Sequence, residues 1–137
     1  MAVSGLDMAM WDALARAFVQ PLAVLLGGAV RPLKAYDSYG LVDPRADEAA
    51  LRQSVEAGFA GVKIKGGDGD LARDVANVAA VRSIIGPHVA LMIDFNQALD
   101  PVEAIRRGRA LERFDLTWIE EPVAAEDLAG HARVRAG

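Results

Sequence analysis

The sequence predicts an α/β fold in which strands of one parallel sheet alternate with helices. Three apolar segments each end in charge: 61–65 ends in Lys63 and Lys65, 89–94 ends in Asp94, and 116–120 ends in Glu120. These charges recur after 29 residues (65 to 94) and then 26 residues (94 to 120), close to the length of one βα unit. Each unit therefore brings a charge to the carboxyl end of its strand, which is the catalytic face of a (β/α) barrel.

The first element expected is helical and covers residues 4–26. Ser4 and Asp7 fit the start of a helix, Pro21 interrupts it, and the glycines at 27–28 end it. Because the pattern changes beyond this point, we treat residues 1–33 as a helical segment and residues 34–137 as the α/β part.

Four strand–helix pairs come next. The strands are expected at 34–39, 61–65, 89–94 and 116–120, and the helices begin at Asp43-Pro44, Asp70, Asp100-Pro101 and near residue 126. An aspartate followed by proline is typical of an N-cap and the first helical residue. Short connections between alternating strands and helices imply a parallel sheet with right-handed crossovers. In the third of these helices, Val102, Ile105 and Leu111 are expected to face the core.

Composition excludes several classes of protein. The chain has 137 residues, of which 53% are hydrophobic, so it is long enough for one packed domain. Its net charge of −4 gives no basic surface for nucleic acid or an anionic membrane. It has no cysteine, hence no disulfide or sulfur-bound metal, which fits a cytoplasmic protein. No apolar run is long enough to cross a bilayer.

The lysines of segment 61–65 are candidates for acid–base chemistry. Strand alternation places Val62 and Ile64 toward the helices and Lys63 and Lys65 on the opposite face, inside a barrel. Two nearby ammonium groups and partial burial would each lower a lysine pKa toward the range of a general base. The alternative is an ordinary solvated strand face, because the K-x-K pattern is short.

The acids at the next two strand ends are candidates for metal binding. Asp94 and Glu120 would lie roughly 5 Å apart across neighbouring strands. An oxygen-only site of this kind suits Mg²⁺ or Mn²⁺. Taken singly, each acid also fits a helix cap or a surface residue, and Glu121 fits a loop. Asn96 and Gln97 are either turn residues or groups that orient the metal site or the substrate.

Other features favour a structural interpretation. The glycine-rich segment 66–69 lacks the spacing of a phosphate loop, so we expect a flexible βα loop. Trp118 is expected in the core between sheet and helices. Arg107 and its neighbouring arginines at 106, 109 and 113 are expected on a solvated helix face.

Together these residues resemble the enolase superfamily, in its mandelate racemase and muconate lactonizing enzyme group, and mandelate racemase most of all. The matching segments run in the family's order along nearly the whole chain: GLDMAMWD at 5–12, PL at 21–22 with LLGG at 25–28, YDS at 36–38, VKIK at 62–65, DFNQ at 94–97 and WIEEP at 118–122.

The resemblance implies a role for each site residue. Lys65 corresponds to the base that removes the α-proton of a carboxylate substrate, and Lys63 to the neighbour that lowers its pKa and binds the carboxylate. Asp94 and Glu120 correspond to two of three Mg²⁺ ligands, and Ser38 to a hydrogen-bond donor to the substrate. A Lys base with Mg²⁺ on an enediolate is the known pattern of this superfamily.

The resemblance also implies that the chain is part of a larger protein. A complete (β/α)₈ TIM barrel has eight units and roughly 250 residues, whereas this chain has four: the N-terminal half of the barrel at 34–137, preceded at 1–33 by the segment that links it to a capping domain. The third metal ligand and the opposite acid/base would come from later strands. The intact protein is expected to be a Mg²⁺-dependent racemase of a mandelate-like 2-hydroxycarboxylate, or an acid-sugar dehydratase, and a homo-oligomer. The alternative is a non-catalytic half-barrel that self-associates through its open sheet edges. The isolated chain is expected to be inactive in racemisation, and its sequence does not identify the substrate.

Overall fold

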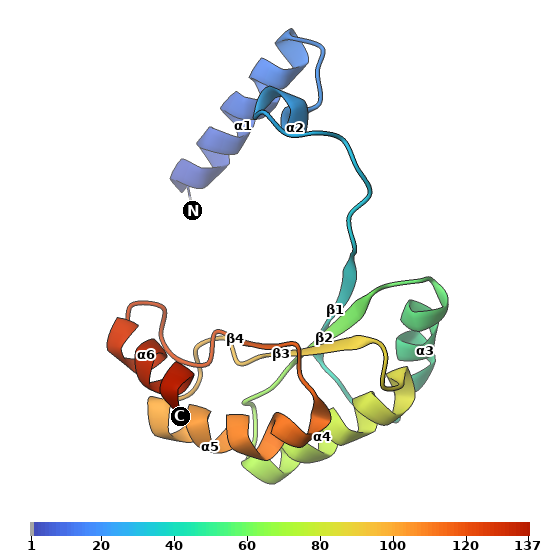
Figure 1. Cartoon of the computed structure of the whole chain (residues 1–137), viewed down its shortest axis with the longest axis vertical. Coiled ribbons are helices and arrows are strands. Elements are labelled where there is room, and N and C mark those ends of the chain that lie inside the picture. The colour runs from blue at the N-terminus through green and yellow to red at the C-terminus, as the bar shows by residue number, and fades with distance from the viewer. Residues whose placement is uncertain (1) are drawn as a thin grey trace. The chain divides into compact units, whose positions relative to one another are not determined.

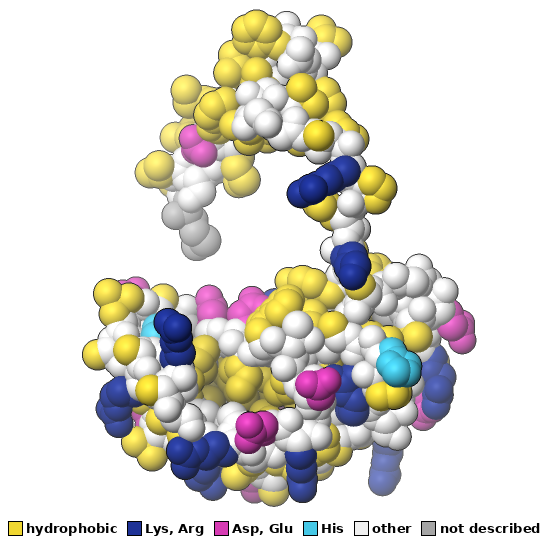
Figure 2. Space-filling model, viewed as in Figure 1, with side chains coloured by type: hydrophobic (Ala, Val, Ile, Leu, Met, Phe, Trp, Pro, Cys, Tyr) yellow, Lys and Arg dark blue, Asp and Glu magenta, His cyan; other side chains and the backbone are white. Residues whose placement is uncertain are grey.

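The computed structural model describes residues 2–137, and the chain divides into two units, Met1–Leu33 and Lys34–Gly137. The first unit contains helices α1 (Ala2–Ala17) and α2 (Leu22–Leu25), with Pro21 directly before α2. Helix α1 is already formed at Ala2, so the predicted cap at Ser4 is wrong. Figure 2 shows hydrophobic side chains spread over the surface of this unit. No helix within residues 2–137 combines the length and apolarity needed to cross a membrane.

The second unit is a four-stranded parallel sheet in the order β1-β2-β3-β4. Its strands are β1 (Tyr36–Leu41), β2 (Gly61–Lys65), β3 (Ala90–Asp94) and β4 (Trp118–Glu120). Its helices are α3 (Glu48–Glu56), α4 (Leu71–Ile85), α5 (Pro101–Leu111), the short 3-10 helix η1 (Glu112–Phe114) and α6 (Leu128–Ala136). Strands and helices alternate along the chain, and Figure 1 shows α3, α4 and α5 along one side of the sheet. The predicted α/β fold of four successive βα units is confirmed.

Helix starts show where local sequence decides structure. The Asp70 carboxylate accepts a hydrogen bond from the Arg73 N–H, and the Asp100 carboxylate accepts from two N–H groups of α5, so both predicted N-caps are confirmed. The predicted helix start at Asp43 is wrong. Asp43 accepts from the Arg45 N–H in a turn, and α3 begins only at Glu48.

The core lies between the sheet and its helices. It includes the β2 side chains Val62 and Ile64, exposed by 0% and 1%, together with apolar residues of β3, α3 and α4. Strand alternation then places Lys63 and Lys65 on the opposite face, as predicted. The prediction that Val102 faces this core is wrong, because 65% of it is exposed on α5.

Charged groups are also buried on the helix side of the sheet. Arg107 of α5 is only 6% exposed and donates to the Asp74 carboxylate of α4, which is 2% exposed. Arg107 also donates to Glu103, one turn earlier in α5, at 2.7 Å. The predicted position of Arg107 on a solvated face is therefore wrong, because α5 directs this guanidinium toward α4 and the loop after β2.

Candidate functional site

The candidate site lies at the carboxyl ends of β2, β3 and β4. In the register of the sheet Lys65 is opposite Asp94, and Asp94 is opposite Glu120. The three strand-end charges therefore stand side by side in adjacent strands. Parallel pairing in register is what brings together residues that lie 29 and 26 positions apart in the sequence.

Lys63 places its ammonium between the two carboxylates. Its Nζ lies 2.9 Å from Glu120 Oε1 and 3.6 Å from Asp94 Oδ2, and its side chain is 12% exposed. The hydrogen bond to Glu120 raises the pKa of Lys63 above its ordinary value, although burial opposes the shift. The predicted lowering is wrong for Lys63, because its close charged partners are the two acids rather than the other lysine.

Asp94 is held in place by the turn that comes after it. It is 5% exposed, its Oδ1 accepts from the Asn96 N–H at 2.9 Å, and its Oδ2 accepts from Asn96 Nδ2 at 3.2 Å. Asn96 and Gln97 both have positive φ, at 46° and 65°, a conformation uncommon for residues other than glycine. Such strained backbone is typical of functional sites. Asn96 thus orients the candidate metal ligand.

Glu120 is held by a residue whose position we predicted wrongly. Trp118 lies two residues earlier in β4, on the same face as Glu120, and its Nε1 donates to Glu120 Oε2 at 3.1 Å. The indole is 40% exposed and meets the Tyr36 ring edge-to-face, at a centroid distance of 5.6 Å. Strand alternation excludes Trp118 from the helix-side core, where Ile119 packs instead.

Lys65 and Ser38 complete the set of predicted residues. Lys65 is exposed at the end of β2, and no ion pair within residues 2–137 includes it. Ser38 of β1 is exposed and is the register partner of Lys63. The site face thus combines one solvent-accessible amine, a hydroxyl, and two acids that share an ammonium. This arrangement places a potential base beside a potential cation-binding pair.

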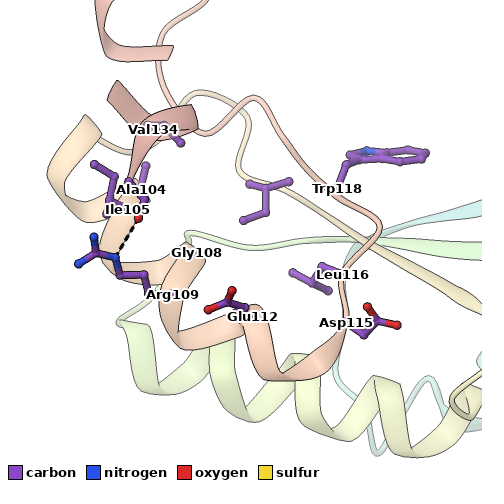
Figure 3. A pocket seen from close by; sticks show the side chains of 11 residues that line it. Ala104, Ile105, Gly108, Arg109, Glu112, Asp115, Leu116, Trp118 and Val134 are labelled. Atoms are coloured by element: carbon purple, nitrogen blue, oxygen red, sulfur yellow. Dashed lines mark hydrogen bonds between the residues drawn. The ribbon is translucent and has the colours of Figure 1, made fainter. Parts of the chain in front are cut away.

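A groove lies at the edge of β4 and shares Trp118 with the surroundings of Glu120. It has a volume of about 390 Å³, and Figure 3 shows its lining side chains from α5, β4 and α6. Apolar groups such as Ile105 and Leu116 line it, and Arg109 donates to the Gly137 carbonyl at its rim. It contains neither the lysines nor the paired acids, so we place the candidate site at the strand ends.

A parallel sheet with helices between its strands, carrying lysines and acids at the carboxyl ends of the strands, is the arrangement expected of part of a (β/α)₈ barrel. Residues 46–137 match the model of the family described as Enolase C-terminal domain-like, and the chain belongs to this family, within the enolase superfamily.

Curated relatives and solved structures agree with this assignment. The chain is 39% identical to L-talarate/galactarate dehydratase of Salmonella typhimurium, over 98% of the chain and 35% of the relative. It is 40% identical to D-galactarolactone cycloisomerase of Agrobacterium fabrum, over 99% of the chain and 37% of the relative. A crystal structure of an enolase from Bradyrhizobium, complexed with magnesium and mandelic acid, matches with a TM-score of 0.94 and 58% identity, covering 99% of this chain and 38% of that one.

These comparisons define the features that the chain shares with its relatives. The chain spans little more than a third of the length of these relatives, as a partial barrel would. The curated relatives include dehydratases, cycloisomerases and epimerases. Several of the similar structures were solved with bound magnesium, in agreement with the predicted cofactor.

Proposed function

We propose that this chain supplies half of an active site that removes the α-proton of a 2-hydroxycarboxylate, with Lys65 as the base. The observation that carries the proposal is the register of the sheet, which sets Lys65 beside Asp94 and Asp94 beside Glu120. A proton α to a carboxylate is very weakly acidic, because its removal creates a dianion. A base alone is therefore insufficient, and positive charge must stand next to it.

Asp94 and Glu120 are the residues that would hold Mg²⁺, with Mn²⁺ as an alternative. Their fit is supported by the ammonium of Lys63, which both carboxylates already attract as a cation. Within residues 2–137 no cluster of three acids or histidines suited to a metal occurs, so the chain offers two ligands of a larger set. A bound cation would supply charge stabilisation for the developing dianion.

The remaining residues would bind and orient the substrate. Lys63 lies two residues before Lys65 on the same face of β2, and a cation bound by Asp94 and Glu120 would free its ammonium to attract the substrate carboxylate. Ser38, opposite Lys63 in β1, offers a hydroxyl donor from the neighbouring strand. Asn96 keeps Asp94 in one orientation and stands at the same edge. Lys65 accepts the proton from one face of the α-carbon.

We favour a mandelate-like substrate and racemisation in the whole protein. Support comes from the Bradyrhizobium enolase, which is 58% identical and was solved with mandelic acid. The second candidate is dehydration of an acid sugar, because the talarate/galactarate dehydratase is 39% identical over almost the whole chain. Both reactions begin with α-proton removal. They differ in the fate of the resulting enediolate, which is reprotonated in racemisation and loses a hydroxyl group in dehydration.

A non-catalytic module is the competing proposal. Among the described residues, β1 and β4 are the edges of the sheet, and edge strands readily pair with another copy. Tyr36 and Trp118, on the barrel side, remain 42% and 40% exposed. These features favour association of the chain, so we also propose that the protein is a homo-oligomer.

Deuterium exchange tests the proposed function. The chain is incubated with Mg²⁺ in D₂O with each enantiomer of mandelate, and loss of the α-proton signal is followed by NMR. We expect exchange of one enantiomer without interconversion, because a base on one face acts on one enantiomer. Lys65→Met should abolish the exchange, whereas Lys34→Met, outside the strands, serves as the matched control. Equal exchange in the wild type and Lys65→Met would contradict the assignment of the base. Galactarate, assayed for a keto-acid product, tests the second candidate.

A further inference from the structure

The loop after β2 is held by the buried Asp74–Arg107 pair. Asp74 Oδ1 accepts a hydrogen bond from the Gly67 N–H at 3.1 Å, while its Oδ2 accepts from Arg107 Nη1. Arg107 Nη2 in turn donates to the Gly69 carbonyl at 3.0 Å. Both members of the pair therefore bind loop backbone as well as each other. The loop that we predicted to be flexible is fixed at two points by groups that are at most 6% exposed.

This loop begins directly after Lys65 and packs against β3. The Gly66 N–H donates to the Asp94 carbonyl at 3.0 Å. A side chain at Gly66 would bring its Cβ to 2.6 Å from Ile93 Cδ1, and Gly67 has a φ of +86°. Only glycine fits this path without displacement or strain. The loop therefore links the strand end that carries Lys65 to the strand end that carries Asp94.

We propose that Asp74 and Arg107 are positioning residues, which set the place of Lys65 relative to Asp94 through the loop that starts at Gly66. The proposal rests on the role of Lys65 as the base. Lys65 has no ion pair within residues 2–137, so its position depends on its backbone. A pair that served only to join α4 and α5 would need no hydrogen bonds to the loop, whereas here each partner makes one.

The test replaces the pair by apolar residues of similar size, Asp74→Leu with Arg107→Met. Such replacements of buried ion pairs often preserve folding, but this one removes both loop hydrogen bonds. The matched control is Glu48→Leu with Arg52→Met, which removes an exposed pair on α3. The chain has three lysines, Lys34, Lys63 and Lys65, so ¹³C labelling of lysine Cε gives three signals, with Lys34 as internal reference.

We expect three changes in the pair variant and none in the control. Protection of the Gly67 amide from hydrogen exchange falls at least tenfold, since its acceptor is lost. The Lys65 Cε signal shifts while that of Lys34 stays. In mandelate deuteration, kcat falls about tenfold and KM changes less than twofold, because a displaced base weakens the chemical step rather than binding.

Two outcomes separate this proposal from the proposed function. If the wild-type chain exchanges no α-proton but the pair variant loses Gly67 protection and shifts Lys65, the function fails and the positioning role stands. Wild-type protection of Gly67 and an unshifted Lys65 signal would overturn the positioning role.

Arg107→Lys provides a second test if the double variant does not fold. In this variant a single ammonium replaces the guanidinium with its several N–H donors. The variant should therefore keep the contact with the Asp74 carboxylate and lose the one with the Gly69 carbonyl. We expect retained Gly67 protection and a shifted Lys65 Cε signal, while the Lys34 signal stays in place. An unshifted Lys65 signal in this folded variant would also overturn the proposal.

Discussion

Two clusters in this protein have the same composition, two carboxylates around one cation, and differ in how the cation is held. Behind the sheet, Arg107 donates to Asp74, Glu103 and a backbone carbonyl. On the barrel side, Lys63 lies between Asp94 and Glu120, with one contact at 2.9 Å and one at 3.6 Å. A guanidinium fixes several acceptors at once, whereas an ammonium is a point charge on a flexible stem. We call the first the Arg107 cluster (Asp74, Glu103 and Arg107), and we expect it to hold its cation permanently. For the second, the Lys63 cluster, we predict that the cation can be exchanged.

The largest effect on stability is expected when the buried Asp74–Arg107 pair loses one of its members. Arg107→Met leaves the Asp74 carboxylate buried without its cation, and removing one member of a buried pair costs about 3–5 kcal/mol of folding free energy. Urea denaturation followed by circular dichroism measures this loss. The double variant with Asp74→Leu should recover most of it. A loss below about 1 kcal/mol would place this cluster with exposed ion pairs.

The second prediction concerns the orientation of Asp94. Asn96→Ala removes the Nδ2 donor to Asp94, and loss of such supporting hydrogen bonds typically weakens metal binding about 10–100-fold. Titration with Mn²⁺, followed by electron paramagnetic resonance, measures the affinity. Gln97→Ala is the matched control, because Gln97 also has positive φ but bonds to the Ala125 N–H instead. Equal losses in the two variants would show that backbone strain, rather than the bond to Asp94, is responsible.

The third prediction tests whether the second cluster exchanges its cation. A metal that binds Asp94 and Glu120 must displace the Lys63 ammonium, so Lys63→Met should raise Mn²⁺ affinity by about tenfold, equivalent to ~1.4 kcal/mol. Lys65→Met should change it less, because Lys65 pairs with neither acid. Weaker binding by Lys63→Met would mean that the ammonium supports the metal site instead of competing with it.

Predictability from sequence depends on the range of the interactions involved. Strand period and repeat length were enough to place Lys63, Lys65, Asp94 and Glu120 at one edge, because both are local properties of a βα unit. The N-caps at Asp70 and Asp100 were also predictable, because each carboxylate accepts hydrogen bonds from N–H groups only two or three residues later.

Features that depend on distant partners were missed. The ion pair of Arg107 joins residues 33 positions apart, and its arginine neighbours in the sequence suggested a solvated face. The pKa of Lys63 is governed by Glu120, 57 positions away. Trp118 was misplaced for a different reason: its size suggested the core, although its alternation with Glu120 in β4 already indicated the opposite face.

The smallest effect is expected at Glu103, the more exposed of the two carboxylates in the Arg107 cluster. Hydrogen bonds from Arg106 and then Arg107 lower the pKa of Glu103 from its usual 4.5 to about 2. A carboxyl whose pKa is lower in the folded state adds stability above its unfolded pKa and loses it as the pH falls toward the folded value. The contribution of Glu103 is therefore complete above about pH 5, declines below pH 4.5 and is gone near pH 2.

Glu103→Gln isolates this contribution. Its urea midpoint should lie below that of the wild type at pH 7, and the two should converge between pH 4.5 and pH 2. Glu48→Gln, on an exposed pair with Arg52, is the control and should show a smaller difference at pH 7. A wild-type advantage that persisted at pH 2 would mean that Glu103 acts through packing rather than charge. The stabilising charge interaction of this cluster would then be confined to Asp74 and Arg107, the two members buried on the helix side of the sheet.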